Sequence, residues 1–201
     1  MERDKQQTEP NVLKSFAHLL GTELKNRRIE IPEKLGKGYC AGFVFNEHIR
    51  MLVFNYELNE DLVVKNPDIN VPMKRILFKF QNIIPKTETL QAGKQLKPIP
   101  SVLIGSRVNT DAIIPIDTNN TAINIEVDTN YLNGLVDLSE KSPVLQSLLQ
   151  NTQPLLFEQM IYPSLQKIVD EIMEEIITES VDETFELFFL RIKAEELVCR
   201  L

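Results

Sequence analysis

The stretch YCAGFVFNEHIRMLVFNYEL, residues 39–58, decides the fold that this sequence predicts. It holds two runs in which large apolar side chains recur at every second position, separated by the polar pair Asn46-Glu47. A period of two indicates a β-strand with one buried face, and asparagine is a frequent turn residue. The stretch therefore predicts an antiparallel hairpin whose inward side chains are Tyr39, Ala41, Phe43 and Phe45 in one strand and Leu52, Phe54, Tyr56 and Leu58 in the other.

Further runs of the same period follow before Asp128. Turn-forming residues separate them, and Asn124 and Glu126 alternate with the apolar side chains of the last run, which is typical of a half-buried strand. Short strands without intervening helices are typical of a sandwich or small barrel. We therefore expect an antiparallel β-barrel or sandwich over residues 28–138, with these further inward positions: Ile76, Phe78, Phe80, Val102, Ile104, Ile123, Ile125 and Val127.

A helix is expected before the strands. Thr8 can cap it, Pro10 is tolerated in its first turn, and apolar residues then recur at helical spacing until Gly21 offers a stop. The spacing gives this helix one apolar side. We expect residues 1–27 to form a helix that packs on the barrel.

After Asp128 the period of the apolar residues becomes helical. The sequence thus predicts an α+β fold in which strands come first and a helical segment follows over residues 139–201. Proline tolerated at the first helical position, or a capping side chain, marks the expected helix starts. These starts are Ser142-Pro143, Pro154 (leading into residues 155–161), Pro163, and Ser180 or Asp182.

The last expected helix carries two apolar stripes, whereas a helix that packs on one side needs only one. The first stripe holds Phe185, Phe188, Phe189 and Ile192. We expect the second stripe to meet a partner subunit in a homodimer. No residue of the kind that ends helices follows, so we also expect the chain to continue into a further domain. The expected dimer contacts are Leu187, Leu190, Leu197 and Leu201.

Composition excludes several classes of function. The 201 residues include 29 acidic and 22 basic side chains, a net charge of −7, and the acidic excess gathers late in the sequence. Non-specific nucleic-acid binding needs clustered Lys and Arg, so we expect no nucleic-acid binding by these residues themselves. The polar start is unlike a signal peptide and no long apolar run occurs, so we expect a cytoplasmic protein without membrane contact.

Candidate catalytic and metal sites are scarce. The two histidines, His18 and His48, lack the spacing of a metal site, and Cys40 and Cys199 lie far apart without a CxxC pattern. No Gly-x-Ser-x-Gly elbow or phosphate-binding glycine loop occurs. We therefore expect no catalytic residue, no metal and no cofactor.

Aromatic side chains concentrate at the inward positions of the expected barrel, where small-molecule pockets are mostly apolar. Arg50 precedes one such face, and Arg75 and Arg107 lie at strand ends, so an anionic or planar ligand fits this composition. The alternative is that the aromatic residues are ordinary core. The candidate ligand-binding residues are Tyr39, Phe43, Arg50, Phe54, Tyr56, Phe78, Phe80 and Arg107.

Nearly the whole chain resembles the N-terminal regulatory domain of a group of AraC-family transcriptional regulators. The similar stretches include IEIPEKLGKGY, GFVFNEHIRML, NYELNED and ILFKFQ. Others are PSVLI, INIEV and the whole helical stretch from SPVLQ to the last residue. The segments concerned are residues 29–39, 42–52, 55–61, 76–81, 100–104, 123–127 and 142–201.

The resemblance implies a cupin-like jelly-roll barrel that senses a small effector and helices through which two subunits pair. In that family a following domain with two helix-turn-helix units reads DNA, and this chain stops before such a domain. The His-x-His pattern of metal-dependent cupins is missing. Two rival hypotheses remain open: a metal-free cupin-type isomerase or epimerase that uses Tyr39 or Tyr56 with an arginine, and a purely structural dimerisation module.

Overall fold

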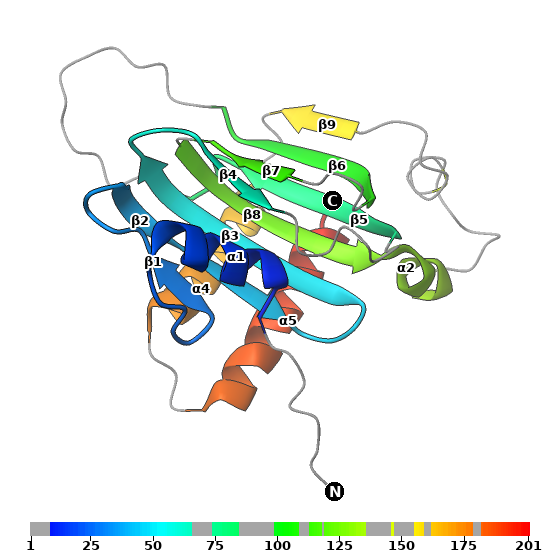
Figure 1. The fold of residues 1–201 in the computed structure, drawn as a ribbon. Helices are drawn as coiled ribbons and strands as arrows, with labels where there is room; N and C mark the ends of the chain where they lie inside the picture. Colours follow the sequence, from blue (N-terminus) through cyan, green and yellow to red (C-terminus); the bar gives the residue numbers. More distant parts are fainter. Residues whose placement is uncertain are drawn as a thin grey trace, which may run out of the picture.

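An antiparallel sheet of seven strands, in the order β1-β2-β3-β8-β5-β6-β9, forms the centre of the molecule in a computed structural model (Figure 1). The structure describes residues 9–65, 74–84, 99–108, 113–117, 119–135, 146, 155–158, 162–178 and 182–201. The strands are β1 (Arg28–Glu30), β2 (Gly36–Val44), β3 (Ile49–Leu58), β5 (Lys74–Gln81), β6 (Ser101–Val108), β8 (Asn119–Asp128) and β9 (Leu155–Glu158).

A second, small sheet pairs β4 (Leu62–Lys65) with β7 (Ile113–Ile116). The main sheet runs from the edge strand β1 to the edge strand β9, and these two strands do not pair in the described part of the chain. The α+β class, with antiparallel strands followed by C-terminal helices, is therefore confirmed. Closure into a cupin-like barrel is not confirmed.

The predicted hairpin is confirmed as β2 and β3, which pair from Gly36↔Leu58 to Val44↔Arg50. Asn46 shapes its turn, because its Oδ1 accepts hydrogen bonds from the backbone N–H groups of His48 (2.8 Å) and Ile49 (2.9 Å). A short polar side chain that bonds the backbone two and three residues on stabilises such turns. The polar pair thus reverses the chain where the pattern predicts.

The prediction that both apolar runs of this hairpin point inward together is wrong. Tyr39 pairs with Asn55 and Phe43 with Met51, and directly paired residues of neighbouring strands lie on the same face of a sheet. Phe54 and Tyr56 therefore lie on the opposite face. The register is shifted by one residue relative to the pattern of large side chains, and both faces of β3 carry apolar residues.

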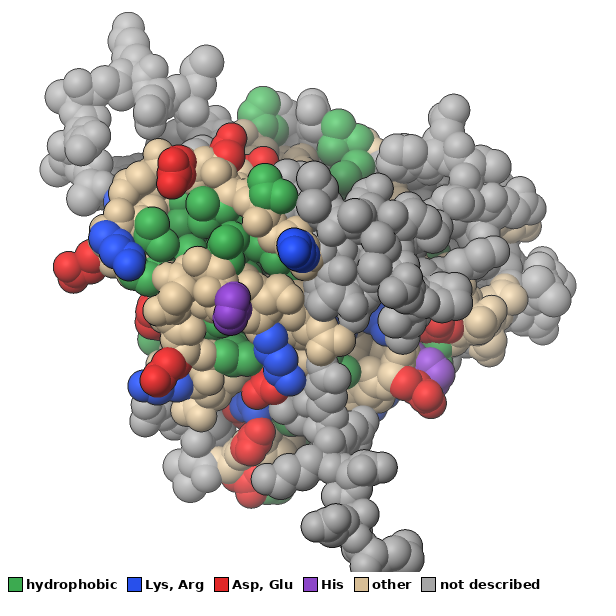
Figure 2. Space-filling view, in the orientation of Figure 1, with side chains coloured by type: hydrophobic (Ala, Val, Ile, Leu, Met, Phe, Trp, Pro, Cys, Tyr) green, Lys and Arg blue, Asp and Glu red, His purple; other side chains and the backbone are tan. Residues whose placement is uncertain are grey.

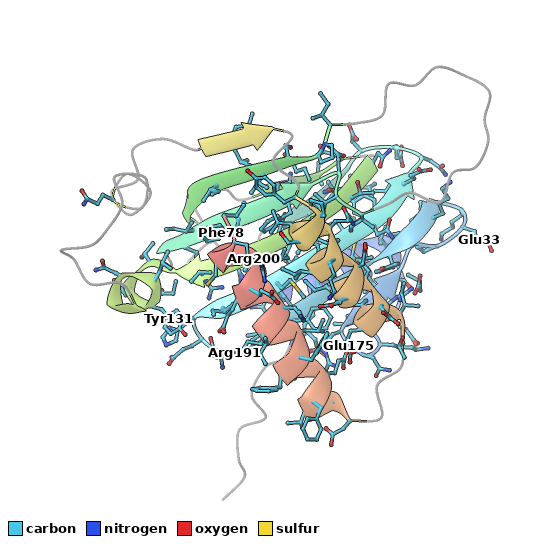
Figure 3. All side chains as sticks on the ribbon, turned by 180° about the vertical axis from the view of Figure 1, so that it is seen from behind. Glu33, Phe78, Tyr131, Glu175, Arg191 and Arg200 are labelled. Atoms are coloured by element: carbon cyan, nitrogen blue, oxygen red, sulfur yellow. The ribbon has the colours of Figure 1, made fainter. Side chains whose placement is uncertain are left out.

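Two C-terminal helices, α4 (Pro163–Ile177) and α5 (Glu183–Cys199), cover one face of the sheet (Figure 3). We call this the α5 face. The helices share one apolar core with the strands, so the C-terminal helices and the sheet are one packed body. Its fully buried members include Phe43, Met51, Ile76, Phe80, Ile123, Ile125, Leu165, Ile172, Leu190 and Leu197.

Helix α1 (Asn11–Leu20) packs on the opposite face, which we call the α1 face, together with the β4–β7 sheet. Gly42 permits this packing, because a Cβ there would lie 2.9 Å from Pro10 Cδ and 3.0 Å from Leu52 Cδ2. Gly21 ends the helix with a left-handed φ of 65°, as predicted. The expected capping residue, Thr8, lies outside the described residues, and Pro10 occupies the cap position. This core holds Leu13, Phe16, Leu20, Ile29, Cys40, Tyr56 and Val64.

The predicted helix starts have mixed outcomes. Pro163 opens α4, and the Asp182 carboxylate accepts hydrogen bonds from the backbone N–H groups of Thr184 (2.7 Å) and Phe185 (3.4 Å) at the start of α5. The helix expected after Pro154 is wrong, because residues 155–158 form β9 on the edge of β6. Pairing with an exposed edge overrides a short apolar pattern. The Ser142-Pro143 start lies outside the described residues.

One short helix, α2 (Thr129–Leu135), follows β8 directly. Asp128 begins it by accepting hydrogen bonds from the backbone N–H groups of Asn130 and Tyr131, both at 2.9 Å. Among the described helices, none has both the length and the apolar character needed to cross a bilayer.

The α1 core predicts a loss of stability in alkali. Burial raises the pKa of the Cys40 thiol well above its usual 9.0 and the pKa of the Tyr56 phenol above its usual 10.0. Below the unfolded-state pKa both states hold the proton and stability is constant. Above it, the unfolded chain releases the proton first. We therefore expect the free energy of unfolding to fall by about 1.4 kcal/mol per pH unit for each group.

Urea denaturation between about pH 7 and pH 10.5 measures this fall. Cys40→Ala removes the first of the two ionisations, so its stability starts to fall about one pH unit later than that of the wild type. A wild-type stability that falls no faster than that of Cys40→Ala between about pH 9 and pH 10 would contradict the burial of the thiol.

Candidate functional site

The most distinctive polar feature of the described residues is a buried charged cluster on the α1 face. Arg50 of β3, Glu126 of β8 and Arg75 of β5 form it, and only 1% of Glu126 and 6% of Arg75 is exposed. Arg50 pairs directly with Glu126 across the two strands. The alternation that turns Ile125 and Val127 toward the α5 face necessarily turns Glu126 to the α1 face.

The two arginines meet the carboxylate unequally. Glu126 Oε2 accepts a hydrogen bond from Arg50 Nε at 2.8 Å and lies 2.6 Å from Arg50 Nη2 in the same ion pair, whereas Arg75 Nη1 lies 3.9 Å away. Arg75 Nη2 also donates to the backbone carbonyl of Glu47 at 3.4 Å. A hydrogen bond between a guanidinium and a carboxylate is charge-assisted, so the Arg50–Glu126 pair is strong and oriented.

Two neighbours complete the polar surroundings. Asn124 lies two residues before Glu126, on the same face of β8, and is 9% exposed. Its Oδ1 lacks a hydrogen-bond partner within the described structure. Arg107 lies opposite Arg75 in the β5–β6 register. The predicted arginines at strand ends therefore do gather at one end of the sheet, although the Arg107 side chain lies outside the described part.

The chemistry of the cluster is that of anion recognition. Guanidinium groups bind carboxylates and phosphates. In this structure the anion bound to the Arg50 guanidinium is the carboxylate of Glu126. Breaking a buried pair by removing one partner leaves an uncompensated charge. The cluster therefore orders the centre of the sheet, and an external anion would have to displace Glu126 from Arg50.

The candidate ligand-binding residues are divided between the two faces. Tyr39, Phe43, Phe78 and Phe80 lie on the α5 face, where Figure 3 labels Phe78, whereas Arg50, Phe54 and Tyr56 lie on the α1 face. The thickness of the sheet separates the two groups. Most of the aromatic members are core residues, with these exposed fractions: Tyr39 6%, Phe43 1%, Tyr56 2%, Phe78 5% and Phe80 1%.

The two tyrosines are poorly suited to proton transfer. Burial raises the pKa of Tyr39 and of Tyr56, so both phenols hold their protons at neutral pH. They also lie on opposite faces of the sheet. An acid or base works best when its pKa lies near the operating pH. The tyrosine and arginine chemistry of the isomerase hypothesis therefore gains no support from this geometry.

The expected dimer contacts are mostly core residues in this structure. Leu190 and Leu197 are 0% exposed and pack on the α5 face of their own subunit, with Leu187 half-buried beside them. These two buried leucines offer no surface to a partner, which corrects the predicted contact set. Leu201 remains 42% exposed. Ala194, at the centre of this stripe, is also 0% exposed and belongs to the same core.

The other stripe of α5 is exposed instead. Phe185 is 72% exposed, Phe188 61% and Ile192 43%. Their spacing of three and four puts them on the side of α5 that faces away from the sheet. We call Phe185, Phe188 and Ile192 the outer stripe. Contiguous exposed apolar surface marks an interaction site more often than scattered single residues do.

Charges on the α1 side do not form a basic surface. Figure 2 shows acidic and basic side chains interspersed over the described part of this side. Within the same described residues, no group of three or more His, Cys, Asp or Glu side chains is placed to hold a metal ion.

Sequence reasoning missed Glu126 and Asn124 as buried polar residues. Their alternation with apolar neighbours is the pattern of a strand with one wet face. The available signal was a glutamate in the middle of a strand, where acidic residues are depleted, with an arginine near a neighbouring strand's start. No protein-family model, no curated protein and no solved structure matches this chain.

The buried cluster predicts a large effect of a small substitution. Glu126→Gln removes a buried negative charge from beside the Arg50 and Arg75 guanidinium groups, so we expect a loss of about 3–5 kcal/mol in the free energy of unfolding. Chemical denaturation at neutral pH measures it.

Glu57→Gln is the matched control on β3. Glu57 forms an ion pair with Lys37 at 2.9 Å, but both side chains are well exposed, so its loss costs at most about 1 kcal/mol. Equal effects of the two substitutions would show that the Arg50–Glu126 pair is not buried as described.

Proposed function

We propose that this chain is a non-catalytic regulatory module of a cytoplasmic transcription regulator, which pairs with a second copy through α5 and senses a small molecule through its sheet. A DNA-binding domain elsewhere in a longer protein would read DNA, as the resemblance to AraC-family regulators implies. We also propose that the sheet is related to the cupin fold. The chain would then divide into an N-terminal helix, a strand domain and a helical dimerisation segment.

The outer stripe of α5 is the observation that carries the proposal. The inner side of α5 is committed to the core through Leu190, Ala194 and Leu197, all 0% exposed. A helix whose second side is also apolar leaves that side for a partner. Asp182 and the core hold the helix in place, so the outer stripe is presented on a rigid element.

A second copy of the chain is the partner that fits. Helices that pair side by side carry apolar residues at alternating spacings of three and four, which repeat every seven residues. The exposed side of α5 follows this spacing at Phe185, Phe188, Ile192 and Cys199. Glu195 takes the position between Ile192 and Cys199 in this spacing, and it forms an ion pair with Arg191 of the same helix at 2.9 Å. Because Arg191 balances this carboxylate, little like-charge repulsion opposes a two-fold pairing.

The size of the outer stripe sets the expected strength. Three partly exposed side chains offer roughly 300–400 Å² per subunit, given that a buried aromatic residue contributes about 150–250 Å². A standard interface buries about 800 Å² per partner. Pairing through the outer stripe alone is therefore weak, with a dissociation constant in the micromolar range or above, and it depends on concentration.

A small anionic effector is the ligand class that the α1 face favours. Arg50, one of the predicted ligand-contacting residues, already holds a carboxylate there, and an effector's acid group would compete with Glu126 for it. Such an exchange would change the packing between β3 and β8. A ligand that binds one arrangement better than the other shifts the population of the two.

One specific observation favours the structural-module hypothesis as a second candidate. The aromatic positions that a ligand pocket would use are filled core, with Phe43 and Phe80 each 1% exposed. In that case the chain pairs as proposed but binds no effector. The two candidates therefore share the prediction about pairing and differ only in the prediction about a ligand.

Phe188→Glu tests the pairing. A charge in the centre of the outer stripe would be desolvated in a paired state, so we expect the dissociation constant of the dimer to rise at least about tenfold, equivalent to 1.4 kcal/mol. Sedimentation velocity from low micromolar to high micromolar concentration measures it.

Leu19→Glu provides the control, because Leu19 is also an exposed apolar residue, 45% exposed, but lies on α1. It should leave self-association unchanged. A wild-type chain that stays monomeric over the whole concentration range, or a Leu19→Glu variant that dissociates as readily as Phe188→Glu, would refute pairing through the outer stripe.

Thermal unfolding tests the effector. A panel of small carboxylic and phosphoric acids is compared with the corresponding neutral amides and alcohols. A ligand at a hundred times its dissociation constant stabilises the folded state by about 2.7 kcal/mol, which raises Tm by several degrees. We expect an acid in the panel to do so and its neutral analogue to fail. Stabilisation by neutral analogues alone would contradict the assignment to Arg50.

A further inference from the structure

The tight turn before β1 holds an arginine, Arg27, in the left-handed backbone conformation that glycine usually adopts. Asn26 and Arg27 have φ values of 46° and 61°, and the turn closes through the backbone pairs Arg28 N to Lys25 O (2.8 Å) and Lys25 N to Arg28 O (2.9 Å). Two-residue turns of this kind prefer Asn-Gly. Arg27 takes the position where glycine would be unstrained, and a strained backbone is retained where the side chain has a role.

The Arg27 side chain reaches the start of α5. It is 4% exposed, and its Nη1 and Nη2 donate to the carboxylates of Glu183 and Glu186, respectively. Its guanidinium also lies over the ring of Phe43, 5.8 Å from the centroid. One side chain thus ties the turn, the sheet and the first turn of α5 together, although about 156 positions of sequence separate Arg27 from Glu183.

The charges around this contact make Arg27 the balancing cation. Burial raises the pKa of Glu186, Arg27 lowers it, and the nearby Glu175 of α4 and Glu183 of α5 raise it again. Two carboxylates therefore pair with one guanidinium, and a third, that of Glu175, lies near enough to Glu186 to repel it. Without Arg27 they would repel one another at the point where α5 begins.

The rest of α5 has separate anchors. Lys193 Nζ lies 2.6 Å from Glu171 of α4, and Leu190, Ala194 and Leu197 are in the core. Loss of Arg27 would therefore loosen the first two turns of α5 and leave the remainder in place. Those first turns carry Phe185 and Phe188, the most exposed members of the outer stripe.

The turn also lies close to α1 along the chain. Only Gly21 to Leu24 separate the end of α1 from Lys25. Helix α1 packs on one face of the sheet and α5 on the other, so a shift of α1 reaches the Lys25–Arg28 turn through a four-residue link and α5 through Arg27. No other described ion pair joins the segment 21–30 to α5.

We propose that Arg27 is a positioning residue that couples the placement of α1 to the order of the first two turns of α5, and thereby regulates how the outer stripe is presented. This inference rests on the proposed function only for its last step. The coupling between α1 and α5 stands on the ion pairs themselves. Effector binding or docking of another segment on α1 would then change self-association on the far side of the sheet.

Native-state hydrogen exchange of the full chain tests the coupling. Arg27→Gly removes the side chain and at the same time suits the left-handed backbone, so a strained turn cannot explain its effect. We expect amides of residues 184–190 to exchange at least about tenfold faster in this variant, with β2 and β3 amides unchanged. Asn26→Gly is the matched control in the same turn and should change exchange less than about twofold.

A double-mutant cycle separates coupling from simple destabilisation. Leu13→Ala loosens α1, with Phe16→Leu as a milder alternative, and we expect either to speed exchange in residues 184–190 only when Arg27 is present. Equal effects of the α1 variants with and without Arg27, or an Arg27→Gly variant with wild-type exchange in α5, would overturn the proposal.

Sedimentation of the same variants tests the last step. We expect Arg27→Gly to weaken the dimer in the same direction as Phe188→Glu. A dimer whose affinity is unaffected by Arg27→Gly, while exchange at 184–190 is faster, would overturn the regulatory step. If the wild type does not pair at all, the proposed function fails, and the exchange measurements still decide whether Arg27 couples α1 to α5.

Discussion

Both faces of the central sheet are apolar, and this constraint governs the rest of the structure. In β3 the residues Met51 and Val53 face α5, while Leu52 and Tyr56 face α1, and all four are at most 4% exposed. Burial of apolar surface is the main favourable contribution to folding. A sheet of this kind must therefore be covered twice, by α1 with the β4–β7 sheet on one side and by α4 with α5 on the other.

Double coverage also explains the position of the polar residues. The α1 face has Arg50, Glu126 and Asn124 among apolar neighbours, and a buried charge is tolerated only when it is paired. The Arg50–Glu126 pair meets that condition through a hydrogen bond from Arg50 Nε and an ion-pair contact from Arg50 Nη2. On the α5 face, Arg27 neutralises two glutamates at the edge of the core. Each face thus has an arginine that pairs with glutamate: Arg50 of β3 on the α1 face and Arg27 of the turn before β1 on the α5 face.

The sequence predicted much of the local structure and less of its arrangement. Periodicity and turn chemistry correctly indicate the β2–β3 hairpin, the Gly21 stop, and the starts of α4 and α5, because these depend on neighbouring residues. The faces of Phe54 and Tyr56 depend on the strand register, and β9 depends on the free edge of β6. Neither is encoded within a short window. Arg27 could not be found from sequence, since its partners lie in the last helix.

The choice between the two stripes of α5 shows the same limit. Both have helical spacing, and the pattern alone assigns the leucines to a partner and the phenylalanines to the core. In the structure the leucine stripe is buried in the core together with Ala194, and Phe185 and Phe188 are exposed. The family resemblance concerns the same helices and strands. It remains a prediction, since the comparisons give no match.

Thiol labelling on α5 tests the central claim, that the leucine stripe faces the sheet and the outer stripe faces away. Phe188→Cys and Leu190→Cys are made separately in a Cys199→Ser background, where the remaining Cys40 is buried. At low protein concentration we predict that Phe188→Cys reacts with a water-soluble thiol reagent nearly as fast as an unfolded control, and that Leu190→Cys reacts at least about a hundredfold more slowly. Protection of position 188 together with rapid labelling of position 190 would contradict the account.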